Sequence, residues 1–194
     1  TRDGAFLTNA KHVVLRNVII EHFATNGIHF RGGSRSNKVV NVRAFSNRRG
    51  VFLNGTNVDA NEIRDMDIRG GLGMSTGMAI TAGDGNFLTN NAVTAFETGF
   101  FIITNASSNT VVGSKFISNG TGVSIGGATR GNRVRNSVID GAGLGTIGVI
   151  LSADTNSQIS NCLISRHVTY GADIRSGAIS NRLMANIIRS NLSA

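Results

Sequence analysis

The 194 residues contain no proline and no tryptophan, and aromatic side chains make up only 6% of them. A buried core must therefore be built from Val, Ile, Leu and small residues. The single cysteine, Cys162, excludes an internal disulfide framework and a metal cluster held by several thiolates. Because Cys162 is followed by Leu163-Ile164, we expect it to be a small buried hydrophobe.

Long apolar runs are also missing, so we expect no contact with a membrane. The opening residues, Thr1-Arg2-Asp3-Gly4, do not have the pattern of a signal peptide. Export stays open, because a signal could have been removed. By length the chain is one domain, 1–194. Three alternatives stay open for it: a fragment of a longer chain, a complete chain or an engineered one.

The chain does contain an excess of positive charge, +8 at pH 7. This excess favours an anionic partner: an acidic polysaccharide, a nucleic acid or an acidic protein surface. Few aromatic residues accompany the charges as stacking platforms, which argues against nucleic acid.

Asparagine recurs throughout the sequence at intervals of 23 to 25 residues. The positions are Asn37, Asn61, Asn86, Asn109, Asn132, Asn156 and Asn181. A fixed period of this length predicts one supersecondary unit stacked along the chain, a solenoid.

Apolar residues keep fixed distances from this asparagine, with His12 taken as the first, degenerate position. Two residues on are Val14, Val39, Ile63, Leu88, Val111, Val134 and Leu183. Seven residues on are Ile19, Ala44, Ile68, Val93, Phe116, Ile139 and Ile188. Residues that tolerate a left-handed backbone separate the two rows, so we expect a bend at Asn17, Asn41, Asp65, Asn90, Asn91, Gly113, Asn136, Asn161 and Asn186.

A glycine then opens a third short strand with apolar first and third residues. These glycines are Gly27, Gly50, Gly77, Gly99, Gly122, Gly148 and Gly171. A period of two with one face inward is typical of a strand. Three short strands per unit do not fit a propeller blade of about 40 residues or a leucine-rich repeat. They predict a parallel β-helix, whose coils stack about 4.8 Å apart.

The asparagine and isoleucine pattern of Asn156–Ile164, followed by Gly171–Ile174, resembles the right-handed parallel β-helices of the pectate-lyase-like superfamily. The resemblance extends from about Ala10 to Asn191. It implies an all-β, single-stranded right-handed β-helix of about seven to eight coils. Members include polysaccharide lyases, glycosidases, alginate C5-epimerases, phage tailspikes and surface-binding proteins, so the resemblance indicates the fold and not one activity.

The resemblance also implies that an active groove would run along the outer face of the strand after the glycine. The central outward row is His29, Phe52, Ala79, Phe101, Ser124, Ile150 and Asp173. The next row is Arg31, Asn54, Thr81, Ile103, Gly126, Ser152 and Arg175. A glycosidase needs two carboxyl groups, and a calcium-dependent lyase needs several oxygen ligands. The single carboxylate of Asp173 argues against both.

The middle of this face is apolar, with Phe52, Phe101, Ile103 and Ile150. An exposed apolar stripe indicates a protein contact or a sugar-stacking platform, unless longer loops cover it. A homotrimer packed along such faces, as in tailspikes, is one version of the protein contact.

Two polar clusters lie near the ends of the solenoid. The first contains His22, His29, Arg31, Arg48 and Arg49. In a metal-free lyase or epimerase His29 would be the base, and Arg31 would neutralise a uronate carboxylate. The alternative is a set of solvated side chains on turns.

The second cluster contains His167, Tyr170, Asp173 and Arg175. There His167 would be the base and Tyr170 the acid of the same β-elimination. Six coils, about 29 Å, separate the two clusters, so they cannot form one site.

We predict no cofactor. Asp59 and Asp84 on successive coils could share a calcium ion, but two carboxylates are too few for a strong site, and turn capping explains these residues and Asp154 better. The glycine-rich loops 70–76 and 141–147 are longer than their equivalents. Although Gly143-x-Gly145-x-x-Gly148 matches the dinucleotide fingerprint, it precedes a strand and not a helix, so we interpret both loops as bulges.

The sequence therefore favours a protein that binds or processes an acidic polysaccharide outside the cytoplasm: extracellular, on a cell surface or on a virion. An enzyme of this kind would be a lyase or a C5-epimerase. Predicted substrate contacts are Arg48, Arg49, Phe52, Asn54, Phe101, Asp173 and Arg175. The alternative is a non-catalytic structural module, such as a tailspike shaft, that associates through its apolar face.

Overall fold

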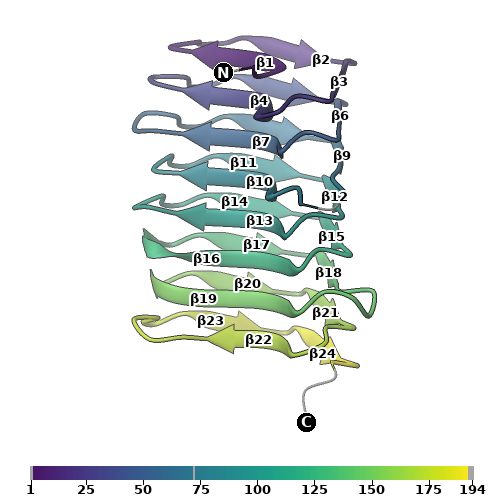
Figure 1. The fold of residues 1–194 in the computed structure, drawn as a ribbon. Coiled ribbons are helices and arrows are strands. Elements are labelled where there is room, and N and C mark those ends of the chain that lie inside the picture. Colours follow the sequence, from purple (N-terminus) through teal and green to yellow (C-terminus); the bar gives the residue numbers. More distant parts are fainter. Residues whose placement is uncertain (1, 72, 192–194) are drawn as a thin grey trace.

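The computed structural model describes residues 2–71 and 73–191. They form a parallel β-helix of about eight turns, and each turn contributes one strand to each of three parallel sheets (Figure 1). No helix occurs in these residues, and so none long and apolar enough to cross a membrane. The predicted all-β solenoid is confirmed.

Each sheet has eight strands. Sheet 1 contains β1 (Ala5–Thr8), β4 (Asn26–Arg31), β7 (Arg49–Asn54), β10 (Thr76–Thr81), β13 (Thr98–Ile103), β16 (Thr121–Arg130), β19 (Ile147–Thr155) and β22 (Tyr170–Ile174). Sheet 2 contains β2 (Val14–Arg16), β5 (Lys38–Val40), β8 (Glu62–Arg64), β11 (Phe87–Thr89), β14 (Thr110–Val112), β17 (Arg133–Arg135), β20 (Gln158–Ser160) and β23 (Arg182–Met184). Sheet 3 contains β3 (Ile19–Glu21), β6 (Arg43–Phe45), β9 (Asp67–Arg69), β12 (Ala92–Thr94), β15 (Lys115–Ile117), β18 (Val138–Asp140), β21 (Leu163–Ser165) and β24 (Ile187–Arg189).

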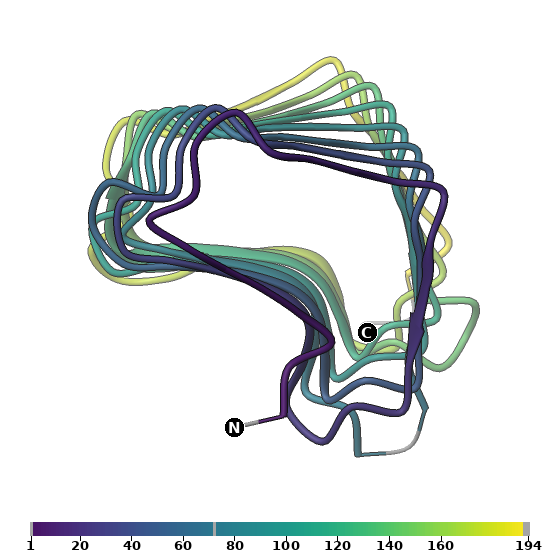
Figure 2. The same cartoon turned by 90° about the horizontal axis from the view of Figure 1, so that it is seen from above.

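Seen along the axis, the turns of chain superpose and enclose one core (Figure 2). Inward residues of each sheet pack against those of the other two, and apolar side chains such as Phe30, Ile63 and Phe116 are at most 1% exposed. Cys162 belongs to this core, and burial raises the pKa of its thiol. The predicted buried cysteine is confirmed.

The buried asparagines bond from one coil to the next. The side-chain oxygen of Asn86 accepts from the backbone and side-chain nitrogens of Asn61, both at 3.0 Å. Asn86 in turn donates from its own backbone and side chain to Asn109 Oδ1 at 2.9 and 3.0 Å. This chain of bonds satisfies polar groups in turns that water does not reach.

We call this chain of bonds the asparagine ladder and each residue in it a rung. The interval in the sequence predicted Asn156 as the sixth rung, but the structure has Ser157 there. The backbone nitrogen of Asn132 donates to Ser157 Oγ at 3.0 Å, and the nitrogen of Ser157 donates to Asn181 Oδ1 at 2.7 Å. Asn156 stands one residue earlier, exposed, with φ 55°. A hydroxyl accepts the same backbone bond as an amide oxygen, so the interval alone could not identify the residue.

The first coil also differs from the prediction. Val14 pairs with Lys38, so the inward rows begin at Leu15 and Ile20, one residue after Val14 and Ile19. The described coil begins at β1, earlier than His12. This coil has no asparagine in the ladder, so nothing in its sequence indicates how β2 and β3 align with β5 and β6.

Bends between the first and second strands use a left-handed backbone, as predicted, at Asn17, Asn41, Asp65, Asn90, Gly113, Asn136 and Asn161. In the last coil Ala185 takes this position (φ 51°). Asn91 and Asn186, predicted at bends, instead accept backbone bonds from Met66 and Cys162 of the preceding coils.

The fixed glycines that open the sheet 1 strands stack on each other too closely for side chains. A Cβ at Gly27 would lie 2.7 Å from the carbonyl oxygen of Gly50, and one at Gly99 would lie 2.7 Å from that of Gly122. Close approach of successive backbones thus explains the glycine period.

Candidate functional site

The outer face of sheet 1 carries the rows that the sequence predicted. The strand register aligns His29, Phe52, Ala79, Phe101, Ser124, Ile150 and Asp173, and adds Phe6 before them. Ala79 is only 4% exposed, and its two neighbours in the row are the larger Phe52 and Phe101, which are half-buried. The apolar stripe is therefore present but is not a fully exposed patch.

His29 lies near the start of this face and is 9% exposed. Its ring stacks on Phe52 with centroids 5.1 Å apart and contacts Phe6 at 5.2 Å. Nδ1 is 2.9 Å from Asp3 Oδ2, whereas Nε2 has no hydrogen-bond partner. An unpartnered buried nitrogen is rare in proteins and marks a candidate site of chemistry.

Asp3 is not among the functional residues predicted from the sequence. Its Oδ1 accepts from Thr25 Oγ1 at 2.5 Å and from the backbone and side-chain nitrogens of Asn26 at 3.1 and 2.7 Å. Burial of the carboxyl raises its pKa, but the bonds from Thr25, His29 and Asn26 outweigh burial and lower the pKa to about 2.

Asp3, whose lowered pKa keeps it ionised at neutral pH, determines the tautomer of His29. Because a carboxylate only accepts hydrogen bonds, the bonded Nδ1 must carry a proton. In the neutral ring the lone pair is then on Nε2. The pair therefore resembles other carboxylate–histidine pairs in which the acid orients a general base.

Two arginines lie near His29 on β4 and β7. Arg49 lies 4.7 Å above the Phe52 ring, and burial followed by the neighbouring charge of Arg48 lowers its pKa, while Asp3 opposes the shift. Arg31 is exposed, two residues after His29 on β4, and pairs across the sheet with Asn54.

The structure thus brings His29, Arg31, Arg49, Phe52 and Asn54 onto two adjacent coils, in β4 and β7, and Arg48 directly precedes Arg49. It leaves out His22, an exposed residue at the turn after β3 in sheet 3.

The second predicted cluster does not converge in this way. His167 is 1% exposed, and its ring lies so close to Gly141 and Gly148 that a Cβ at these glycines would be 2.9 and 3.1 Å from it. Its backbone nitrogen bonds to an asparagine of the next coil, as those of Phe23 and Phe96 do, so the imidazole occupies a core position.

Burial lowers the pKa of His167 although Asn191 and Asp140 oppose the shift. Tyr170 is 48% exposed on β22. Asp173 and Arg175 form an ion pair at 2.8 Å. This placement does not support the predicted base–acid pair of His167 and Tyr170.

The predicted capping role of the corner aspartates is confirmed. Asp59 Oδ1 accepts from the backbone nitrogen of Asp84 at 2.9 Å, and Asp84 Oδ1 from that of Ser107 at 2.7 Å. Asp154 is fully buried and accepts from Thr129 and Ser157 hydroxyls. In residues 2–71 and 73–191, no group of three or more His, Cys, Asp or Glu side chains could hold a metal ion.

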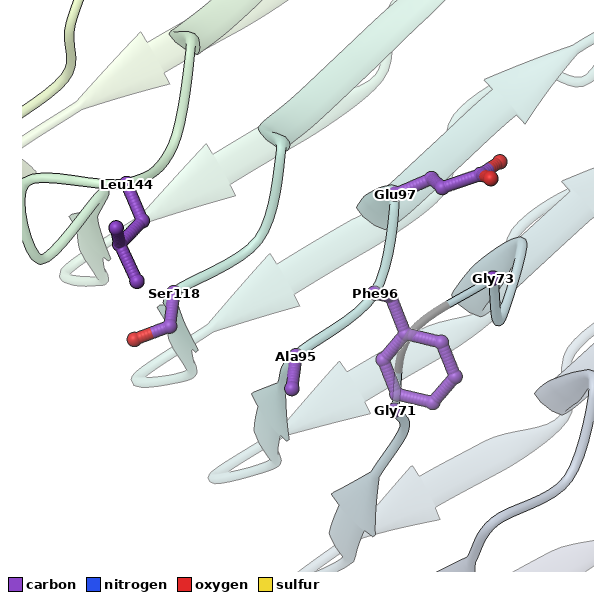
Figure 3. Close-up of a pocket in the computed structure, with 7 residues that line it drawn as sticks. All are labelled: Gly71, Gly73, Ala95, Phe96, Glu97, Ser118 and Leu144. Carbon is purple, nitrogen blue, oxygen red and sulfur yellow. The ribbon is translucent and has the colours of Figure 1, made fainter.

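Both longer loops bulge at the corner between sheets 3 and 1, as predicted, apart from Leu72, which lies outside the described residues. Between them is a pocket of about 490 Å³ (Figure 3), lined by Gly71, Gly73, Ala95, Phe96, Glu97, Ser118 and Leu144. Asp140 fixes the second loop by accepting from the Ala142 nitrogen at 2.9 Å and pairing with Arg166, which lowers the pKa of Asp140.

A family model described as "Periplasmic copper-binding protein (NosD)" matches residues 1–142 of this β-helix. The chain belongs to the NosD family. A search of the curated proteins gave no match.

Solved β-helices of the pectate-lyase-like type resemble this NosD-family chain closely in fold. The periplasmic alginate epimerase AlgG superposes with a TM-score of 0.82 at 13% identity, over 96% of this chain and 47% of AlgG. DFA-IIIase from Arthrobacter chlorophenolicus A6, without its lid, gives 0.69 at 17% identity, over 97% and 55%. The A-module of the Azotobacter vinelandii mannuronan C-5 epimerase AlgE4 gives 0.65 at 14% identity, over 96% and 54%. The chain thus spans about half the length of these structures.

Proposed function

We propose that this protein binds an acidic polysaccharide on the outer face of β1, β4 and β7 and removes a proton from it. The observation that carries the proposal is the buried Asp3–His29 pair on the outer face of sheet 1, whose Nε2 has no partner, with Arg31 two residues along β4 and Arg49 over the Phe52 ring. His167 Nε2 is also buried without a partner, so the bond to Asp3 and the position on the outer face distinguish His29 from a core histidine.

In a uronate the proton at C5 is acidic because it lies next to a carboxylate. Arg31 would bind and neutralise this carboxylate, and His29 Nε2 would accept the C5 proton once the Phe6 or Phe52 ring packed against the imidazole moves aside. If the electron pair then forms a C4=C5 bond, the C4–O bond breaks and the leaving oxygen takes a proton from water, which is the lyase outcome. If a proton returns to the opposite face of C5, the product is the epimer.

The charge distribution supports an anionic substrate at this end of the solenoid. Residues 1–57 contain nine basic and two acidic side chains, a net charge of +7, whereas residues 58–194 contain ten and nine. An uneven charge of this kind attracts polyanions to one end. The names of the similar structures, two alginate or mannuronan epimerases among them, support the same substrate class. The periplasmic descriptions of NosD and AlgG support a location outside the cytoplasm.

Copper, which the family description names, does not fit the residues present. The described part of the chain has no three-ligand group, His29 Nδ1 is bonded to Asp3, and the buried Cys162 has a raised thiol pKa. We therefore assign no step to copper.

The apolar stripe still favours the structural alternative as a second candidate. Stable trimers in light scattering at micromolar concentration, together with no affinity for uronates, would support it.

Loss of the C5 proton tests the proposal, because lyase and epimerase share this step. Uronate oligomers from alginate and pectate would be incubated in D₂O, and NMR would follow two products: deuterium at C5, which an epimerase gives as C5 exchange, and the C4=C5 double bond, which a lyase gives. We expect one of these products with the wild type and a loss of about 100-fold or more in His29→Gln. The control, His22→Gln, removes an exposed histidine elsewhere and should leave the reaction intact. Absence of both products with every uronate, or equal formation in His29→Gln, would refute the proposal.

A further inference from the structure

The corner that follows β1, β4 and β7 contains a basic pocket that the proposed reaction does not use. Its volume is about 390 Å³, and it is lined by Asn9, Lys11, Gly33, Arg35 and Asn57. Lys11 and Arg35 are bridge partners on adjacent coils, so their side chains leave the backbone about 4.8 Å apart. Two cations at this spacing at the rim of a concave site are suited to one anionic group.

Neither cation is neutralised within the described chain. Lys11, Arg31 and Arg35 take part in none of its ion pairs. The carboxylate of Asp59 follows on the next coil, but its Oδ1 accepts the backbone bond from Asp84.

The wall of the pocket is fixed by local bonds. Asn9 Oδ1 accepts from the Gly33 nitrogen at 3.0 Å, and a Cβ at Gly32, whose φ is +58°, would lie 2.7 Å from the same oxygen. The polar groups left for a ligand are therefore the two cations, the Asn9 amide nitrogen and the Asn57 amide, so donors outnumber acceptors in the pocket.

We propose that this anion pocket binds the acidic group of a second saccharide unit, adjacent to the unit whose carboxylate meets Arg31. The inference rests on the proposed function and narrows its substrate class. Arg31 and Arg35 are four residues apart, at most about 14 Å of chain, which neighbouring units of one glycan can span. The substrate is then a glycan with acidic groups on consecutive units, and an isolated uronate is too short.

The test compares two double variants that remove the same charge. Lys11→Gln/Arg35→Gln alters the anion pocket, and Arg43→Gln/Lys115→Gln alters exposed positions on sheet 3. Calorimetry would measure the Kd of mannuronate and galacturonate tetramers, of the monosaccharides, and of a neutral tetramer. For the tetramer that binds the wild type, we expect the pocket variant to bind about tenfold or more weakly and the sheet 3 variant within about twofold.

Lys11→Arg/Arg35→Lys keeps both charges and should bind the tetramer within about threefold of the wild type. This variant distinguishes the effect of losing the charges from the effect of damaging the turn. Monosaccharide binding should be equal in all variants. Equal weakening by both double variants would overturn the anion pocket in favour of long-range charge. Wild-type affinity in the pocket variant, with loss of the C5 proton still dependent on His29, would overturn the pocket alone. No uronate binding by the wild type would overturn the proposed function as well.

Discussion

At the residue scale, the chemistry depends on one carboxylate that holds one imidazole. Asp3 lies on the coil before His29, and 26 residues separate them in sequence. Sequence reasoning found His29 and Arg31 through the outward rows of the repeat. It missed Asp3 because this residue precedes β1, where no repeat position could be assigned.

Asp3→Asn should reverse the tautomer of His29. An amide nitrogen facing Nδ1 cannot accept its proton, so the proton moves to Nε2 and the base is lost. We expect loss of the C5 proton to slow by about 100-fold and the free energy of unfolding at pH 7 to fall by about 1–3 kcal/mol. The ¹⁵N spectrum of His29 distinguishes this positioning effect from simple destabilisation. An unchanged tautomer with a lost reaction would contradict the assigned role.

Asp3 should also make stability depend on pH in the acid range. Its pKa is lowered in the folded state from 3.8 to about 2, so the stabilisation is present above the unfolded value and is lost as pH falls from about 4 towards 2. Thermal unfolding across this range should show a drop for the wild type that Asp3→Asn lacks.

Asp154 should act in the opposite direction. Burial raises its pKa, although Thr129 and Ser157 donate to its ionised form. Its contribution to stability is therefore complete below pH 3.8 and is lost as pH rises through the folded pKa. Asp154→Asn keeps an oxygen acceptor for both hydroxyls and should remove this decline. A steeper decline in the variant would show that the carboxyl is ionised without cost.

At the scale of elements, the three strands and two asparagine-rich turns of each coil could be predicted because every coil repeats the same constraints. The period of the apolar residues, the residue types at the bends and the repeated glycine of sheet 1 all follow because successive coils stack at one strand spacing. The prediction of the rung residue failed where one chemical group replaces another, as Ser157 replaces asparagine. The repeat also gave no sign that the ring of His167 enters the core. Position in the repeat does not determine which residue type fills it.

Asn109→Ala tests the energetics of the ladder. Asn109 accepts both bonds from Asn86 and donates to the Gly83 carbonyl at 2.8 Å, so alanine leaves buried polar groups without partners. We expect a loss of about 2–5 kcal/mol in chemical denaturation. Asn109→Ser should lose less, because Ser157 already serves as a rung, and Thr89→Ala on the outer face of sheet 2 should lose about 0.5 kcal/mol or less. Equal losses at Asn109 and Thr89 would contradict the ladder.

At the scale of the whole molecule, a uniform solenoid carries an uneven surface. The coils share one backbone geometry, but the excess positive charge, the Asp3–His29 pair and the anion pocket all lie on the first three coils. Sequence reasoning predicted the anionic partner from total charge. It predicted contacts near both ends of the solenoid without choosing between them, because only the stacked coils bring residues 3, 29 and 49 together.

The most direct test of the account is the ¹⁵N NMR spectrum of the histidine rings during titration with a uronate tetramer. We predict that free His29 carries its proton on Nδ1, and that its Nε2 signal shifts saturably with the tetramer while the buried His167 signals stay unchanged. A proton on Nε2 in the free protein, or His29 signals that do not move at saturating tetramer, would contradict the assignment of this pair as the site of proton removal.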